Sequence, residues 1–292
     1  MAGSISEAAR AKINLALHVT GRRADGYHLL DSLVTFVDLG DALEFWPSEA
    51  DGFHVEGQFG ALLGAEHDNL VLRARDALRQ LAQNLGCATP PVRIKLVKNL
   101  PIASGIGGGS ADAAATLRGL SRLWKLDLPE AKLKTLAVSL GADVPMCLAS
   151  TPLVARGIGE ELTLLPDLPA FPILLANPLV GVSTPEIFRA LTKRNNPPLP
   201  PFPLEGADWW PYLHNLRNDL QPPAEELVPE ISTVITALET SGAGLVRMSG
   251  SGATCFALYH SQAEVEAALS RLKETHPTWY LAASHTLTGS QA

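Results

Sequence analysis

A glycine-rich loop between a strand pattern and a helix pattern is the feature of this sequence with the clearest chemical meaning. Gly105, Gly107, Gly108 and Gly109 lie in the segment PIASGIGGGSADAAATL, residues 101–117, and its alanine-rich end predicts a helix. Glycines let backbone N–H groups approach a phosphate closely, and the N–H groups and dipole at a helix start attract an anion. The loop therefore predicts a phosphate-binding site.

The loop differs from the two common nucleotide-binding motifs. No GK[ST] closes it as in a Walker A loop, and Ser110 stands where the third glycine of G-x-G-x-x-G belongs. A tight turn without a ligand is the alternative interpretation. Turn geometry alone does not explain three consecutive glycines, because each costs extra backbone entropy on folding, so we favour the phosphate site.

Phosphoryl transfer also needs a group to orient or deprotonate the acceptor hydroxyl and a charge to neutralise the transferred group. Asp143 lies between Gly141 and Pro145 in the apolar segment GADVPMCLA, where an unpaired carboxylate would be costly to bury. Lys12, on the polar face of a strand pattern, is the candidate partner. The residues alone leave two alternatives open: Asp143 as a turn or helix cap, and Lys12 as a solvated strand lysine.

Strand and helix patterns position these residues in the first half of the chain. Residues 12–20 alternate between apolar and polar, so Lys12 and Asn14 point to the same side of a strand. A turn follows, and Tyr27 and His28 lie at its end. Further patterns predict strands at 29–39, 41–46 and 53–57 in an antiparallel sheet, another at 92–98, and helices at 69–85, from the glycine loop to about 124, and at 129–140.

Beyond about residue 155 the pattern indicates a small α+β lobe. The proline-rich segment 196–206 predicts a surface loop, since proline is unsuited to a helix interior or a central strand. The remaining patterns predict helices at 223–242 and 262–276 and strands at 244–250, 253–259 and 278–284.

Length and composition narrow the class of protein. A chain of 292 residues favours two lobes with a cleft between them, and 46% hydrophobic with 18% charged residues is typical of a folded protein. The net charge of −7, without basic runs, argues against a nucleic-acid or membrane-surface partner. We expect Cys87, Cys147 and Cys255 to be reduced core residues. Without a leader pattern or a long apolar run, we expect a cytoplasmic location.

PIASGIGGGSADAAATL resembles the phosphate-binding motif of the GHMP kinase family, usually written P-x-x-x-G-L-G-S-S-A-A. Its triple glycine resembles the form in the branch that acts on a cytidine-diphosphate methylerythritol. AKINLALHVTGRRADGYHLLDSL, SLGADVPMCL and RMSGSGATCFAL resemble further segments of that branch in the same order, so the resemblance spans nearly the whole chain. It implies an α+β fold of two lobes: residues 1–155 like domain 2 of ribosomal protein S5, and residues 156–292 ferredoxin-like and contributing to substrate binding.

The resemblance also implies a reaction, in which ATP as its Mg²⁺ complex donates its γ-phosphate to the 2-hydroxyl of that methylerythritol substrate. Asp143 would be the base, and Lys12 would lower the pKa of the hydroxyl. Asn69 and Lys98 would lie near the nucleotide base, although an exposed strand-end charge is an alternative for Lys98. The triphosphate would be wrapped by Pro101, Ile102, Ala103, Ser104, Gly105, Ile106, Gly107, Gly108, Gly109, Ser110 and Ala111.

The resemblance further implies a cytidine pocket. Tyr27 would stack on the cytosine and His28 would hydrogen-bond to it. Thr184 and Phe188 would close the other side, with the base between Tyr27 and Phe188, although Phe188 could instead be a core residue. Asn14 would bind the methylerythritol hydroxyls. Gly250 and Gly252 would permit close backbone approach near the reacting groups.

Two departures from the family motif are small. Ile106 replaces leucine with similar volume. Ala111 replaces a frequent serine, which leaves Ser110 as the hydroxyl there and the magnesium ligands unassigned. A homoserine- or mevalonate-type GHMP kinase and a non-catalytic ligand sensor are the alternative functions. The oligomeric state, monomer or weak homodimer, stays open.

Overall fold

The computed structural model describes residues 3–63 and 69–289, and its chain forms two compact units. The first unit comprises residues 1–11, 39–102 and 107–149, and the second comprises residues 12–38, 103–106 and 150–292, each within the described limits. Strands β1 (Ile5–Arg22) and β2 (His28–Pro47) contribute residues to both units, so the units interleave along the sequence. The division of the chain into lobes at residue 155 stays a prediction.

The first unit contains a mixed strand arrangement. The second half of β2 pairs antiparallel with β4 (Val92–Val97), and β4 pairs parallel with β3 (Gly52–Glu56). The predicted antiparallel pairing of the 53–57 strand is therefore wrong. Helix α1 (Leu70–Asn84) lies between β3 and β4 in the sequence, and a helical crossover is the usual connection between parallel neighbours.

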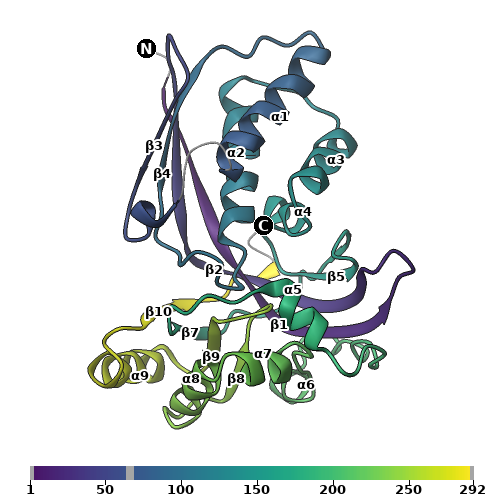
Figure 1. The fold of residues 1–292 in the computed structure, drawn as a ribbon, viewed down its shortest axis with the longest axis vertical. Helices are drawn as coiled ribbons and strands as arrows, with labels where there is room; N and C mark the ends of the chain where they lie inside the picture. Colours follow the sequence, from purple (N-terminus) through teal and green to yellow (C-terminus); the bar gives the residue numbers. More distant parts are fainter. Residues whose placement is uncertain (1–2, 64–68, 290–292) are drawn as a thin grey trace. The chain divides into compact units, whose positions relative to one another are not determined.

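Among its described residues, the first unit also contains the 3₁₀ turn η1 (Gly60–Leu62) and the helices α1, α2 (Gly108–Leu123), α3 (Glu130–Leu140) and α4 (Val144–Ala149). The α-helices pack against one another (Figure 1). Small residues let α2 approach the strands closely, because a Cβ at Gly119 would lie 2.3 Å from the ring of Phe45. Helix α4 was not predicted, since a proline at its second residue resembles a loop although proline is tolerated there.

The second unit is built on an antiparallel sheet in the order β10 (Tyr280–His285), β7 (Pro172–Asn177), β9 (Cys255–Leu258) and β8 (Leu245–Met248). Helices α8 (Glu230–Glu239) and α9 (Gln262–Thr275) pack against it (Figure 1). The first half of β2 pairs with β5 (Leu153–Gly157), which pairs with β6 (Glu161–Leu164). The described part of this unit also contains the short helices α5 (Thr184–Ala190), α6 (Trp210–His214) and α7 (Gln221–Leu227).

Several predicted elements differ in extent from the observed ones. The predicted strands 29–39 and 41–46 form one strand, β2; its Gly40 is required because a Cβ there would lie 2.3 Å from the Ala9 carbonyl oxygen of β1. The predicted helix 223–242 is interrupted between α7 and α8, where Pro229 has no N–H to donate. Segment 196–206 has no regular structure, as predicted.

Two further sequence expectations concern cysteines and membrane spans. Cys147 and Cys255 are buried, whereas Cys87 is only half-buried, and all three are free thiols. In the part of the chain that the structure describes, no helix combines the length and the apolar composition needed to span a bilayer.

Candidate functional site

The start of α2 has the properties of an anion site. Gly107 precedes the helix in a left-handed conformation, φ 67°, that favours glycine, and its N-cap position provides no capping side chain. The next two glycines are crowded: a Cβ at Gly108 would lie 3.2 Å from Lys98 Nζ, and one at Gly109 would lie 3.3 Å from Leu70 Cδ1. The left-handed φ therefore favours glycine at position 107, neighbouring side chains lie close to Gly108 and Gly109, and the helix N-terminus is left available for an anion.

Residues 103–106 of the glycine loop belong to the second unit, where they form hydrogen bonds with the segment 249–254. Ser249 Oγ donates to the Gly105 carbonyl at 3.1 Å, and Thr254 N donates to the Ser104 carbonyl at 3.2 Å. Gly105 has φ 75°, and a Cβ there would lie 2.5 Å from the Ser249 carbonyl oxygen and 2.7 Å from that of Gly252. A Cβ at Gly250 would likewise lie 2.7 Å from the Gly105 carbonyl oxygen, so the backbones of the two segments approach closely, whereas the approach of Gly250 and Gly252 to the reacting groups stays a prediction.

Lys12 and Asn14 lie together on β1, as the alternation predicts. Lys12 Nζ donates to Asn14 Oδ1 at 2.8 Å, and Asn14 Nδ2 donates to Ser32 Oγ at 2.8 Å. Lys12 N also donates to the Ile106 carbonyl at 2.9 Å, and Asn14 N donates to Ser249 Oγ at 3.1 Å. Lys12 is only 5% exposed, so the alternative of a solvated strand lysine is wrong. This polar group links β1 to both the glycine loop and Ser249.

Asp143 lies in the first unit, between α3 and α4. Its carbonyl accepts from Cys147 N at 3.1 Å, and its side chain is half-buried. The turn is tight, because Val144 N donates to the Gly141 carbonyl at 3.1 Å. Asp143 and Lys12 belong to different units, and their pairing stays a prediction.

Lys98 lies beneath the start of α2 in a buried charge cluster. Its Nζ donates to Asp41 Oδ2 at 2.5 Å and to Asp112 Oδ2 at 2.8 Å, and Lys98 is only 2% exposed. The alternative of an exposed strand-end charge is therefore wrong. Asn69 caps α1, where its Oδ1 accepts from Val71 N at 2.8 Å. The contacts of Asn69 and Lys98 with a nucleotide base stay predictions.

The residues of the predicted cytidine pocket lie in the second unit. Tyr27, 61% exposed, is at the tip of the β1–β2 hairpin, where Arg23 N donates to its carbonyl at 2.7 Å. The rings of His28 and Phe188 stack with centroids 4.8 Å apart and 22° between their planes. Thr184 Oγ1 lies 2.7 Å from Ser251 Oγ. Phe188 also packs against the buried core, so the core interpretation describes part of its surroundings.

His28 carries an unsatisfied ring nitrogen. Its Nε2 is buried, and no group in the described residues hydrogen-bonds to it. Burial, together with the charges of Arg194 and Arg22, lowers the pKa of His28 below its ordinary value. The ring is therefore neutral at pH 7, with one nitrogen able to donate and the other to accept.

Sequence reasoning missed the residues that hold the loop at 248–252. Asn218 Nδ2 donates to the carbonyls of Met248 and Gly250, each at 2.8 Å, and Asn218 is 4% exposed. Arg247, also buried, donates to the carbonyls of Leu15, Leu213 and Leu216. Asn218 is 30 residues before Met248 and 32 before Gly250 in the sequence, so no local pattern predicts these hydrogen bonds.

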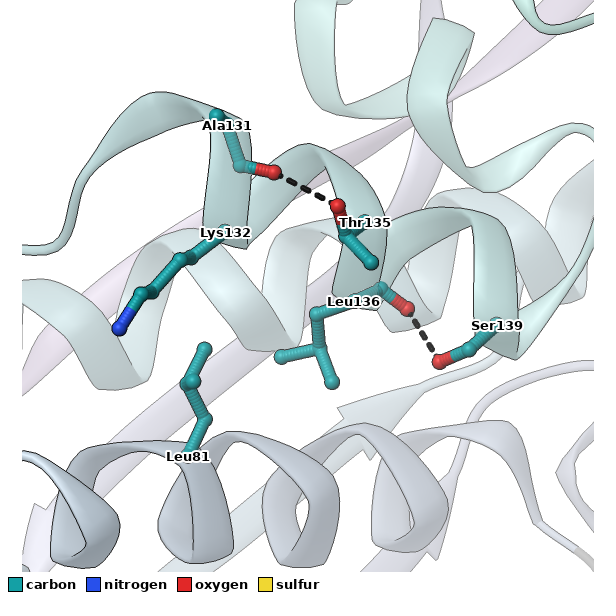
Figure 2. A pocket seen from close by; sticks show the side chains of 6 residues that line it. All are labelled: Leu81, Ala131, Lys132, Thr135, Leu136 and Ser139. Atoms are coloured by element: carbon teal, nitrogen blue, oxygen red, sulfur yellow. Dashed lines mark hydrogen bonds between the residues drawn. The ribbon is translucent and has the colours of Figure 1, made fainter.

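A shallow apolar groove in the first unit lies apart from the predicted residues. Figure 2 shows Leu81 of α1 facing Lys132 and Leu136 of α3, with Ala131, Thr135 and Ser139 completing its lining. The hydroxyls of Thr135 and Ser139 donate to carbonyls of α3 itself, those of Ala131 and Leu136. The groove offers no converging polar groups and none of the predicted site residues line it.

The uncapped start of α2 suits a phosphate group. Within residues 3–63 and 69–289, no group of three or more His, Cys, Asp or Glu side chains is placed to hold a metal ion. Ser104 and Ser110 are the hydroxyl side chains within residues 101–111.

Comparisons with known proteins agree with this geometry. The model of the GHMP kinases N terminal domain matches residues 69–151, and that of the GHMP kinases C terminal matches residues 211–278. The 4-diphosphocytidyl-2-C-methyl-D-erythritol kinase of Rhizobium etli is 57% identical over 287 residues, 98% of this chain and 96% of its own. The protein of that name from Mesorhizobium japonicum is 50% identical over 98% of this chain and 97% of its own.

Solved structures show the same relationship. A crystal structure of 4-(cytidine 5'-diphospho)-2C-methyl-D-erythritol kinase, 33% identical, superposes with a TM-score of 0.80 over 96% of this chain and 98% of its own. Homoserine kinase from Cytophaga hutchinsonii, 20% identical, superposes with a TM-score of 0.69 over 98% of this chain and 96% of its own. The second likeness shows the fold alone.

Proposed function

This chain belongs to the GHMP kinase family, and we propose that it transfers the γ-phosphate of ATP to the 2-hydroxyl of 4-diphosphocytidyl-2-C-methyl-D-erythritol. Relatives that carry this acceptor in their names match nearly the full chain at 50–59% identity. The predicted α+β GHMP kinase fold and the kinase prediction are both confirmed by these matches. The reaction belongs to the synthesis of isoprenoid precursors.

The observation that best supports a cytidine-containing acceptor is the stack of the His28 ring on Phe188, in which His28 Nε2 is buried without a hydrogen-bond partner among the described residues. A buried polar atom without a partner costs free energy unless a ligand satisfies it. The edge of cytosine offers both donors and acceptors, which suits a neutral imidazole. Thr184 and Ser251, joined by a hydrogen bond, supply hydroxyls in the same unit. His28 already covers one face of the Phe188 ring. A cytosine between Tyr27 and Phe188 would therefore have to stack on the other face of Phe188, or His28 would have to move.

The glycine loop and α2 would bind the ATP phosphates. The Gly107 conformation and the missing cap leave the start of α2 suited to phosphate oxygens. Mg²⁺ bound with ATP would neutralise phosphate charge. Ser110, in the first turn of α2, would supply a hydroxyl to that complex.

Lys12 and Asp143 would act on the acceptor hydroxyl. Asp143 would take its proton, and the buried Lys12 would stabilise the developing negative charge. Asn14 orients the Lys12 ammonium through a 2.8 Å hydrogen bond and would present its amide to the methylerythritol hydroxyls. General-base action of this kind contributes about 10²–10⁴ in rate.

The test is ADP release by the purified protein with Mg-ATP and one acceptor at a time. The acceptors are the cytidylated methylerythritol, homoserine and mevalonate, with no acceptor as the background. We expect turnover above background with the cytidylated compound alone. Turnover with another acceptor would refute the roles of His28 and Phe188, and ATP binding without any turnover would favour the ligand sensor.

A further inference from the structure

Three buried charged residues meet under the start of α2: Asp41 is 1% exposed, Lys98 2% and Asp112 4%. The fold brings them together locally. Ala42 lies opposite Val97 in the antiparallel β2–β4 pair, so Asp41 and Lys98 are the next pair along. Gly108 and Asp112 are four residues apart in α2 and therefore lie on one face of the helix. That face is turned toward Lys98.

Each carboxylate holds one end of the glycine loop. Asp41 Oδ1 accepts from Asn99 N at 2.6 Å and from Leu100 N at 2.9 Å, which fixes the chain just before Pro101. Asp112 belongs to the second turn of α2, just after the loop. The Lys98 ammonium bonds to both carboxylates, at 2.5 and 2.8 Å. One side chain thus joins the two ends of the loop.

The backbone of Lys98 is fixed as well. Lys98 N donates to the Glu56 carbonyl at 2.7 Å, and the Lys98 carbonyl accepts from Phe59 N at 2.9 Å. A Cβ at Gly57 would lie 2.6 Å from Lys98 N, so the chain after β3 is closely packed against it. The backbone that carries the Lys98 ammonium is therefore held by hydrogen bonds at both its N–H and its carbonyl group.

The charges in the cluster are unequally satisfied. Asp41 accepts three hydrogen bonds, whereas Asp112 Oδ1 has no partner among the described residues. Burial raises the pKa of Asp112, against the attraction of Lys98. Burial opposes the charge of Lys98, but Asp112 and Asp41 hold its pKa above the ordinary value. Asp112 therefore has fewer hydrogen bonds than Asp41, and the hydrogen bond from the charged Lys98 ammonium holds its carboxyl group in place.

We propose that Asp41, Lys98 and Asp112 form a buried clamp that sets the separation of the two ends of the glycine loop for the nucleotide triphosphate. All three are positioning residues, and Lys98 acts on the triphosphate through α2 instead of contacting the nucleotide base. This inference rests on the ATP-dependent function proposed above.

The test is calorimetric binding of Mg-ATP and Mg-GTP, with inorganic tripolyphosphate as a competitor of ATP. The proteins are the unmodified chain, Lys98→Met, Asp112→Asn and the double variant. Lys95→Met is the matched control, because Lys95 lies on the same strand and its 30% exposed side chain pairs with Glu56 at 2.7 Å. No acceptor is present, so binding is measured independently of phosphoryl transfer.

We expect Lys98→Met and Asp112→Asn each to weaken ATP, GTP and tripolyphosphate by a similar factor of about 10 or more, equivalent to about 1.4 kcal/mol. The double variant should bind no more weakly than Lys98→Met, since the clamp is already broken. Lys95→Met should bind normally. Loss of ATP affinity with unchanged GTP and tripolyphosphate affinity would overturn the clamp and assign Lys98 to the base. Additive losses would also overturn it.

Thermal unfolding of each variant separates loop positioning from general misfolding. If Lys98→Met does not fold, Asp41→Asn is measured in its place. The amide oxygen of the asparagine can still accept hydrogen bonds from Asn99 N and Leu100 N, but the negative charge beside Lys98 is lost. This variant should weaken ATP and tripolyphosphate equally, and normal affinities would overturn the clamp. If the unmodified chain binds ATP but does not phosphorylate the cytidylated acceptor, the proposed acceptor is wrong. The affinities of the variants for ATP and tripolyphosphate still test the clamp in that case. No ATP binding by the unmodified chain would overturn both.

Discussion

Ser249 donates its hydroxyl hydrogen to the Gly105 carbonyl at 3.1 Å, and the same Ser249 oxygen accepts from Asn14 N at 3.1 Å. One hydroxyl therefore joins three segments that are distant in the sequence: the strand that carries Lys12, the glycine loop and the 248–252 loop. The second unit thereby fixes part of the phosphate loop relative to Lys12 through short, buried contacts. Each of these segments resembles a motif of the kinase family.

Asp143→Asn should lower turnover by about 100-fold or more, because an amide cannot take the acceptor proton. The unfolding free energy should change by less than about 1 kcal/mol, since size and shape are kept. Steady-state kinetics and urea unfolding measure both. Asp127→Asn, at an exposed position in the same unit, is the control and should leave both unchanged. Near-normal turnover in Asp143→Asn would refute its role as the base.

Gly105→Ala should destabilise the protein by about 2–4 kcal/mol, because it combines a left-handed residue with a collision against backbone atoms. Gly86→Ala is the matched control: its φ of 78° is close to the 75° of Gly105, but nothing lies within 4 Å of its Cβ. The control should lose only about 1–2 kcal/mol. Urea unfolding compares the two variants, and equal losses would mean that the contact with Ser249 and Gly252 contributes little.

Asn218→Asp should destabilise the protein by about 2–3 kcal/mol, because a carboxylate cannot donate to the carbonyls of Met248 and Gly250. It should also lower turnover, since those carbonyls belong to the loop that contacts Gly105. Asn215→Asp, which alters one exposed hydrogen bond to Pro211, is the control. Urea unfolding and kinetics would show the account to be wrong if both variants behaved alike.

The pH dependence of acceptor binding should report His28. Its pKa lies below 6.5, so the ring is neutral above that pH and the KM for the cytidylated acceptor should be constant there. As pH falls through the lowered value, a charge forms near Arg194 and Arg22, and the KM should rise. The unfolded state takes up its proton first, so the stability present above pH 6.5 is also lost on acidification.

His28→Gln is the control for this titration, since glutamine keeps hydrogen-bonding groups without titrating. Its KM should be higher at pH 8 and nearly flat on acidification. An unmodified chain and a His28→Gln variant with the same pH profile would exclude His28 as the titrating group. KM for the acceptor, measured at saturating ATP between pH 5 and 8, gives the profiles.

Local patterns predicted the elements that carry the strongest periodicity. Alternation in β1 placed Lys12 and Asn14 on one side, and the hydrogen bond between them confirms it. Strands β5, β6 and β7 were missed; β7, for example, is buried almost throughout and has no polar–apolar alternation. The pairing of β3 was wrong because sequence spacing does not distinguish parallel from antiparallel partners when a helix lies between them.

The partners of site residues were harder to predict than the residues themselves. Asp41 resembles an ordinary strand residue and Asp112 an ordinary residue of an alanine-rich helix. Their common partner Lys98 becomes apparent only from the β2–β4 register and the turn of α2. The phosphate interpretation of the glycines was likewise incomplete, since Gly108 also makes room for the Lys98 ammonium and Gly105 for Ser249.

Phosphorus and carbon NMR of the product formed from Mg-ATP and 4-diphosphocytidyl-2-C-methyl-D-erythritol identifies the hydroxyl that receives the phosphate. We predict a new phosphate monoester whose phosphorus couples to the tertiary carbon that bears the 2-hydroxyl, with one ADP formed for each monoester. A phosphate on any other hydroxyl, or ADP formed without a phosphorylated acceptor, would contradict the account.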